Sequence, residues 1–459
     1  MHRFRTSRTV SVFAAVAVVL AGCASTSRSA TPSRSASTSR SATPTAAGRP
    51  STSGTSSALA DQKVTPSMSA LKTACPTPTS CYVSGNVSTT GGGVPGLFQG
   101  AVDGTDAYLA YQNALGGLDG RRFKLIAADD SLACEKNRAQ TTALASQVIA
   151  FTGSFSLVDQ CGGTVLAADP KVPDVSATLD PATAALPNVF SVQPLVPGMA
   201  TGALLYFKQK FPQAVTKVGS LVVDFGAAPT QWAGQEQAME HLGYKIVYER
   251  QFSPAETDFS ADVVKMEQAG VQMVVLSAIN DSYGGRLLQQ MHAQGFHPKV
   301  VWGGASIYSG VDAADPTIVK DAGGASVADG VYLEQAQALY LGQDAARVPE
   351  IGTFLHWVHG LYPGANIDLY TLYGWTSAQL YVDALRHAGP DPDQAALMAA
   401  LEKETSFDAG GMLAPADPAG KQPASCYVLA QVVGGTFQRV DMPAGATYRC
   451  DGHYDVTKG

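Results

Sequence analysis

The sequence lacks the short motifs on which most enzyme classes depend. It has no Gly-x-Ser-x-Gly, no His-Glu-x-x-His and no Gly-x-x-x-x-Gly-Lys-Ser/Thr, the motifs of serine hydrolases, zinc peptidases and phosphate-binding loops. A Ser-x-x-Lys occurs at 69–72 without the Ser-Asp-Asn and Lys-Thr-Gly of penicillin-binding enzymes. His356 and His359 have helical spacing, but such pairs lie more often on a helix surface than at a metal. We therefore predict a protein that is not an enzyme, with no catalytic residue, no metal and no cofactor.

Basic residues and long apolar runs are also scarce. The formal net charge is -7, with 31 Lys and Arg against 38 Asp and Glu, whereas nucleic-acid binding requires a basic face. A polybasic contact with lipid is excluded for the same reason. Beyond the N-terminus, no segment has the roughly 18 consecutive apolar residues of a membrane-spanning helix. The apolar content of 45% fits a globular protein that lies outside the membrane.

The N-terminus has the parts of a secretory signal in order. Basic residues within the first eight positions precede a largely apolar run at 10–20 that contains no acidic residue, and the segment LAGC ends at Cys23. This arrangement resembles the bacterial lipobox, after which the signal is cleaved and the cysteine is lipidated. An ordinary secretory signal followed by a chance cysteine is the alternative. We predict a signal peptide at 1–22 and a lipid anchor on Cys23, at the outer face of the bacterial cell membrane.

A tether is predicted at 23–72, after the signal. Ser, Thr, Ala and Pro dominate this region, and SRSATP at 27–32 is nearly repeated at 33–38 and 39–44. Such a composition buries too little apolar surface to offset the entropy of ordering. We expect it to let the folded part stand away from the membrane.

Six cysteines remain besides Cys23, and an extracytoplasmic compartment permits disulfides. Six cysteines allow 15 pairings, but they fall into three groups along the chain. Cys75 and Cys81 bracket a tight loop, Cys426 and Cys450 lie around an apparent hairpin, and Cys134 and Cys161 are left. We predict these three pairs, although each could be unbridged.

From residue 81 on, β-branched runs alternate with helical segments, which predicts parallel α/β structure. The alternation runs twice, with a Pro-rich segment at 192–198 between the runs. We predict two doubly wound parallel-sheet lobes with a hinge and a cleft between them, and a C-terminal tail that adds strands to one lobe. Predicted strands cover 83–88, 123–127, 147–151, 172–175, 218–223, 245–249, 273–276 and 300–302. Predicted helices cover 97–113, 135–146, 164–168, 198–211, 232–241, 258–268, 283–293, 349–361, 369–387 and 393–403.

An ordered series of segments resembles type 1 periplasmic binding proteins, the leucine/isoleucine/valine-binding relatives of ABC importers. Residues 92–140 are similar to the first lobe of that family; their sequence is GGVPGLFQGAVDGTDAYLAYQNALGGLDGRRFKLIAADDSLACEKNRAQ. Its second lobe is similar to DFSADVVKMEQAGVQMVVL at 258–276 and GGRLLQQMHAQGFHPKVVWGG at 284–304. The resemblance covers roughly residues 80–440.

The resemblance implies three features of the fold. Cys134 and Cys161 match family positions that are often bonded. The chain crosses between lobes near 193–198, 328–335 and 408–415. Ligand binds between the lobes at the carboxyl ends of strands. We place one lobe at 73–193 with 332–408, and the other at 194–331 with 409–459.

The resemblance also implies the ligand-binding residues. Hydroxyls and helix N-terminal amides in the first-lobe loops suit an oxygen-rich ligand group. The candidates are Ser154, Phe155, Ser156, Ser176, Thr178 and Asp180 in the first lobe, and Trp232, Asn280, Asp281, Tyr283 and Ser306 in the second. Amino-acid binders of the family hold the ligand ammonium with an acidic residue where this chain has Ala305 and Ser306. Asp180 or Asp281 would have to supply that charge.

We therefore predict a lipid-anchored, monomeric solute-binding protein of an ABC importer. It would bind a small polar solute, such as an amino acid, an amide or a small organic acid, and deliver it to a membrane permease. The alternatives are an extracytoplasmic ligand sensor of the same fold and a non-transport envelope protein with a degenerate cleft.

Overall fold

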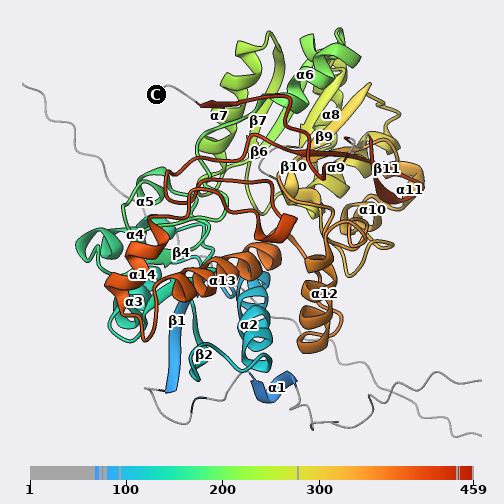
Figure 1. Cartoon of the computed structure of the whole chain (residues 1–459). Helices are drawn as coiled ribbons and strands as arrows, with labels where there is room; N and C mark the ends of the chain where they lie inside the picture. The colour runs from blue at the N-terminus through green and yellow to red at the C-terminus, as the bar shows by residue number, and fades with distance from the viewer. Residues whose placement is uncertain are drawn as a thin grey trace, which may run out of the picture. The chain divides into compact units, whose positions relative to one another are not determined.

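A computed structural model describes residues 68–71, 75, 80–92, 95–276, 279–440, 443 and 445–456. The predicted signal peptide, Cys23 and nearly all of the tether lie outside these residues. The described residues belong to one unit that spans 64–459. Figure 1 shows its two large sheets with the helices around them.

The first lobe is built on a four-stranded parallel sheet of order β2-β1-β3-β4. Helices cover both faces, because alternate residues of each strand point to opposite sides. Val87 and Phe151 cluster with Leu144 and Leu166 of two helices on one face. On the other face, α2 packs against α13 (Figure 1). The elements of this lobe are β1 (Cys81–Ser88), α2 (Gln99–Ala114), β2 (Arg122–Asp129), α3 (Cys134–Ala145), β3 (Ala150–Thr152), α4 (Asp159–Ala168), β4 (Asp174–Val175), α5 (Pro181–Ala184), α12 (Pro349–Leu361), α13 (Leu369–His387) and α14 (Gln394–Leu401), with α1 (Met68–Leu71) against α2.

The second lobe is built on a seven-stranded sheet of order β12-β11-β10-β9-β8-β6-β7. The strands from β10 to β7 are parallel, and β11 and β12 add an antiparallel edge. The turn between β11 and β12 is made by Gly434 and Gly435, both at positive φ, as a two-residue hairpin turn requires. The elements of this lobe are β5 (Gly198–Ala200), α6 (Thr201–Lys210), β6 (Val218–Val223), α7 (Ala228–His241), β7 (Ile246–Phe252), α8 (Ser260–Gln268), β8 (Met273–Leu276), α9 (Asp281–Ala293), β9 (Val300–Gly303), α10 (Thr317–Ala322), α11 (Ala325–Ala328), β10 (Tyr332–Gln335), β11 (Val428–Val433), β12 (Thr436–Arg439) and β13 (Tyr454–Val456).

Three separate segments of the chain meet between the two sheets. The Gln193 side-chain amide donates to the Ala414 carbonyl at 2.8 Å. The Ala414 amide donates to the Ala336 carbonyl at 2.7 Å, and the Ala338 amide donates to the Met412 carbonyl at 2.9 Å. These bonds hold the connections of the two lobes side by side.

The prediction of two α/β lobes is confirmed, and the C-terminal tail joins the second sheet through β11 and β12. Two local predictions were wrong. Residues 198–200 form β5 instead of the start of a helix, because β13 pairs with them from the end of the chain. Helix α4 begins at Asp159 and includes Gly162 and Gly163, which permit a close approach: a Cβ on Gly162 would lie 2.6 Å from the Asn137 side chain.

The structure contains the three predicted disulfides, Cys75–Cys81, Cys134–Cys161 and Cys426–Cys450. The second of them joins the first residue of α3 to α4. It therefore links two helices that cover one face of the first sheet.

Replacing both Cys134 and Cys161 with serine is expected to lower the free energy of unfolding by about 3–4 kcal/mol. The bond joins residues 27 apart in sequence, and without it the unfolded chain gains the conformational entropy of an open loop of that length. The double serine variant of Cys75 and Cys81 is the control. These cysteines are six residues apart, so the free energy of unfolding should fall by only about 2 kcal/mol. Urea unfolding of both variants measures the two losses. A loss for the 134/161 variant no larger than the control's would contradict this expectation.

Candidate functional site

A cavity of about 810 Å³ lies between the two sheets. Its walls come from residues in the loops and first helical turns that follow the carboxyl ends of strands in both lobes: within 95–100 after β1, Phe155 and Leu157 after β3, within 225–231 after β6, within 279–283 after β8 and within 304–309 after β9. The first turn of α13 supplies a further wall. Open α/β sheets bind ligands at this edge, and the volume is in the range of small-molecule sites.

Most of the cavity wall is apolar. Phe98, Phe155 and Tyr370 form an aromatic cluster with ring centroids 4.5–4.7 Å apart. Their edge-on and tilted arrangement adds to the stability of the packing. Further apolar and aromatic side chains on the wall are Leu97, Leu132, Leu157, Leu179, Leu195, Met199, Val223, Phe225, Trp302 and Tyr373.

The charged groups on the wall are all acidic. Asp103, Asp281, Glu334 and Asp368 line the cavity, and among the described residues no Lys, Arg or His does. Asp368 caps α13, where its carboxylate accepts from the amide and hydroxyl of Thr371, both at 2.8 Å. Burial raises the pKa of Asp368 to about 6.

Asp281 is also held by the protein itself. Its carboxylate accepts from the Ser309 hydroxyl and, at 2.8 Å, from the Ser282 amide. Burial raises the pKa of Asp281 above its usual range. Each of these aspartates already has hydrogen-bond donors from its own lobe or helix, so neither needs a ligand to satisfy it.

Glu334 differs from these aspartates. It lies on β10, where it alone keeps part of its side chain exposed while Tyr332, Leu333 and Gln335 are buried. Its carboxylate has no hydrogen bond or ion pair within the part of the chain that the structure describes. Burial raises the pKa of Glu334 to about 7. Glu334 is therefore an unpartnered carboxyl group on the cavity wall.

Five of the predicted ligand residues line this cavity: Phe155, Asn280, Asp281, Tyr283 and Ser306. The polar ones make hydrogen bonds within the protein. The Asn280 side chain accepts from the Tyr283 amide at 3.1 Å and so caps α9. The Ser306 hydroxyl donates to the Ile279 carbonyl at 2.7 Å. That these five contact a ligand stays a prediction.

Four predicted residues of the first lobe line a second cavity of about 40 Å³: Ser154, Ser156, Ser176 and Thr178. The Ser156 hydroxyl donates to Asp130 at 2.5 Å, and the Ser154 amide donates to the Ser176 hydroxyl at 3.0 Å. The three serine hydroxyls stabilise the loops of the first sheet, whereas the buried Thr178 hydroxyl has no hydrogen-bond partner among the described residues. Their contact with a ligand stays a prediction.

Asp180 and Trp232 do not line the large cavity. Asp180 caps α5 by accepting from the Thr183 amide at 2.8 Å. Trp232 lies on α7, is 1% exposed and packs into the apolar core of the second lobe. The aromatic residue that reaches the cavity after β6 is Phe225. It was missed because the alignment with the family pointed to the helix, whereas Phe225 lies in the strand-end segment VVDFG itself.

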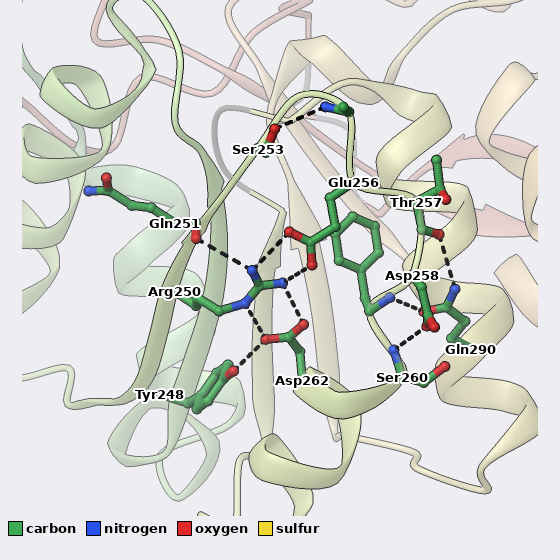
Figure 2. Close-up of polar contacts among 12 residues, drawn as sticks. Tyr248, Arg250, Gln251, Ser253, Glu256, Thr257, Asp258, Ser260, Asp262 and Gln290 are labelled. Carbon is green, nitrogen blue, oxygen red and sulfur yellow. Dashed lines mark hydrogen bonds and ion pairs between the residues drawn. The ribbon is translucent and has the colours of Figure 1, made fainter. Parts of the chain in front are cut away.

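An ion-pair cluster holds the loop between β7 and α8, which contributes Pro254 to the cavity wall, and Figure 2 shows the contacts of this cluster. Arg250 on β7 donates to both oxygens of Asp262, at 2.5 and 2.6 Å, and to both oxygens of Glu256, at 3.0 and 2.7 Å. The loop between β7 and α8 is thereby tied at both ends. Pro254 in this loop lines the cavity and accepts a hydrogen bond of 2.7 Å from the Tyr283 hydroxyl.

The described residues show no sign of two other kinds of site. None of their helices has both the length and the hydropathy needed to cross a bilayer. Nor do they include a group of three His, Cys, Asp or Glu side chains placed to hold a metal ion.

The fold and the cavity together define a two-lobed binding protein, and solved structures share this fold. The chain is 17% identical to the branched-chain amino acid transporter substrate-binding protein of Streptococcus pneumoniae in complex with isoleucine, with a TM-score of 0.60 over 82% of this chain and 100% of that one. It is 17% identical to a solute-binding protein of R. palustris in complex with benzoate, with a TM-score of 0.62 over 81% and 98%. It is also 17% identical to a fatty acid ABC transporter substrate-binding protein from Thermomonospora curvata, with a TM-score of 0.64 over 82% of this chain and 93% of that one.

Comparison of sequences gives the family. No curated protein matches the chain significantly. The family model described as periplasmic binding protein matches residues 85–436, most of the chain. The chain therefore belongs to the periplasmic binding protein family, whose members are extracytoplasmic binding proteins. The resemblance found in the sequence is confirmed.

Replacing Arg250 with alanine is expected to lower the free energy of unfolding by about 3 kcal/mol, because Asp262 would be left as a buried charge without its cation. The Asp262 side chain is 4% exposed. The matched control is Arg138→Ala, which removes an exposed pair with Glu135 and should change stability by about 0–1 kcal/mol. Urea unfolding compares the two variants, and equal losses would show that the cluster is not a structural tie.

Glu334→Gln is expected to stabilise the ligand-free protein at pH 8. The pKa of Glu334 is raised from 4.5 to about 7, so between these values the native state holds a proton that the unfolded state has released. Wild-type stability therefore falls as pH rises through this window, by about 3 kcal/mol at most, and glutamine removes this loss.

Urea unfolding at pH 4.5 and pH 8 measures this difference. Glu267→Gln, at an exposed position of α8, serves as the control and should show no comparable pH dependence. A Glu334→Gln effect of the same size at both pH values would contradict the burial of an unpaired carboxylate.

Proposed function

We propose that the protein is an extracytoplasmic solute-binding component of an ABC importer. The observation that carries this proposal is the cavity of about 810 Å³ at the carboxyl ends of strands in both lobes. A solute held there touches both lobes, so its binding favours the arrangement in which the lobes approach each other. The hydrogen-bonded segments at 193, 336–338 and 412–414 are the points about which such a movement would turn.

The relatives support a solute-binding role without defining the solute. Two of the similar structures hold isoleucine and benzoate, and a third is the substrate-binding protein of a fatty acid ABC transporter. The wall of the present cavity is mostly apolar and aromatic, so it favours a larger and more apolar solute than the amino acid, amide or small organic acid predicted from sequence. A cavity of this size also supports binding over an envelope protein with a degenerate cleft.

The N-terminal sequence supports a lipid anchor on Cys23, which would hold the protein beside a membrane permease. A free carrier would need to find the permease by diffusion in three dimensions, whereas an anchored one stays at the membrane surface. A sensor that hands the ligand signal to a membrane receptor would use the same anchor and the same cavity.

A thermal-shift screen of amino acids, amides, organic acids, fatty acids and amines tests the proposal. A bound solute at 100 times its dissociation constant should stabilise the protein by about 2.7 kcal/mol. Gly304→Leu is expected to abolish the shift by filling the cavity. Gly304 has φ of -87°, and the nearest atom to an added Cβ is the Glu334 carbonyl oxygen at 3.9 Å.

Gly352→Leu is the matched control for this variant. Gly352 is exposed on α12, and a Cβ there would meet no atom within 4 Å. It should keep the full shift of the wild type. If no compound shifts the melting of the wild type, or if the Gly304→Leu protein still responds fully, the cavity is not a solute site.

A further inference from the structure

We propose that the solute carries a protonated amine, which pairs with the Glu334 carboxylate, and an apolar body that lies against the aromatic wall of the cavity. This inference rests on the proposed function and names the chemical class of the solute. No carboxylate is required on the solute, which separates this class from the amino acids that the sequence resemblance favoured.

The strand register places Glu334 where a solute can reach it. Strands β9 and β10 are parallel, with Trp302 beside Tyr332 and Gly303 beside Leu333. Side chains two residues apart share a face of a strand, so Glu334 lies on the same face as Tyr332 and next to Trp302. The next residue after β9, Gly304, lies beside Glu334, and because it has no side chain it leaves the Glu334 carboxyl group uncovered. Trp302, Gly304 and Glu334 all line the cavity.

The carboxyl group of Glu334 has no partner among the residues that the structure describes. Burial of an ionised carboxylate without a partner is unfavourable, and the other cavity aspartates avoid this through hydroxyl and amide donors. A cation with N–H donors would supply both the charge and the hydrogen bonds that Glu334 lacks. Trp302, on the adjacent strand, is among the residues that line the cavity, and aromatic rings attract ammonium groups.

The rest of the wall disfavours an anionic solute. Four acidic side chains and, among the described residues, no basic one line the cavity. A ligand carboxylate would find no cationic partner and would face Asp103, Asp281, Glu334 and Asp368 in a poorly solvated space, where like charges repel strongly. An alcohol or amide would escape this repulsion but would gain less from Glu334 than an ammonium group.

The raised pKa of Glu334 is consistent with this pairing. The other titratable groups whose charges act near Glu334 are the tyrosines Tyr427 and Tyr454, and burial raises the pKa of both well above the usual range of a tyrosine. Glu334 is thus the group that changes charge near neutral pH at this end of the cavity. A bound ammonium favours the ionised carboxylate, so amine binding should strengthen as pH rises from 6 to 8.

Two matched sets of compounds test the proposal: octylamine, octanol and octanoate, and tryptamine, tryptophol and indole-3-acetate. Isothermal titration calorimetry of the purified protein at pH 6 and pH 8 measures each affinity. At least one amine should bind about tenfold or more tightly than its matched alcohol and acid, with a larger preference at pH 8. Glu334→Gln should remove this preference, and Glu267→Gln, at an exposed site, should retain it.

The proposal is overturned if an acid binds as tightly as its matched amine, or if Glu334→Gln leaves the amine preference intact. It is also overturned if none of the six compounds binds while the wider screen finds a solute without an amine. In each of these cases the proposed function survives, because a solute still occupies the cavity. If no compound in either experiment binds, the proposed function itself fails and the inference falls with it.

Discussion

The cavity depends on the three crossings of the chain between the sheets. Backbone and side-chain hydrogen bonds join Gln193, Ala336 and Ala414, which come from three distant parts of the sequence. Gln193 and Ala414 are buried, so each bond there replaces contacts with water that the folded chain can no longer make. Because these crossings are fixed side by side, the carboxyl ends of both sets of strands face the same space. The loops that follow the strands then become the walls of one cavity.

Much of the fold could be predicted from the sequence because most strands carry their own signal. The predicted bounds of β6 and β8 are those observed, since each is a short buried run of β-branched residues between helical segments. Strand β10 was not predicted, because Glu334 and Gln335 interrupt its apolar pattern. Its extended conformation is held by hydrogen bonding to β9 and β11, which the local sequence does not reveal. Strand β5 was predicted as helix for a related reason: its partner β13 lies at the other end of the chain.

The wall of the cavity could be predicted from the sequence less completely than the fold, and the reason is physical. Sequence shows that hydroxyl groups follow the strands of the first lobe, but not whether neighbours already satisfy them. In the structure, Ser154 and Ser176 bond to the backbone of their own sheet, and Ser156 bonds to Asp130. The aromatic wall was harder to find, because Phe98 and Tyr370 come from α2 and α13 ends that are far apart in sequence and meet only through packing.

Glu334 illustrates how a residue that lowers stability can point to function. The structure satisfies the carboxylates of Asp368 and Asp281 with nearby donors and ties Asp262 to Arg250, yet among the described residues it offers Glu334 no donor on a wall that is mostly apolar. A leucine at that position would add to the core, and a glutamine would avoid the buried charge. Departures from local stability of this kind are expected at functional sites. The partner that Glu334 lacks in the protein is therefore best sought in the solute.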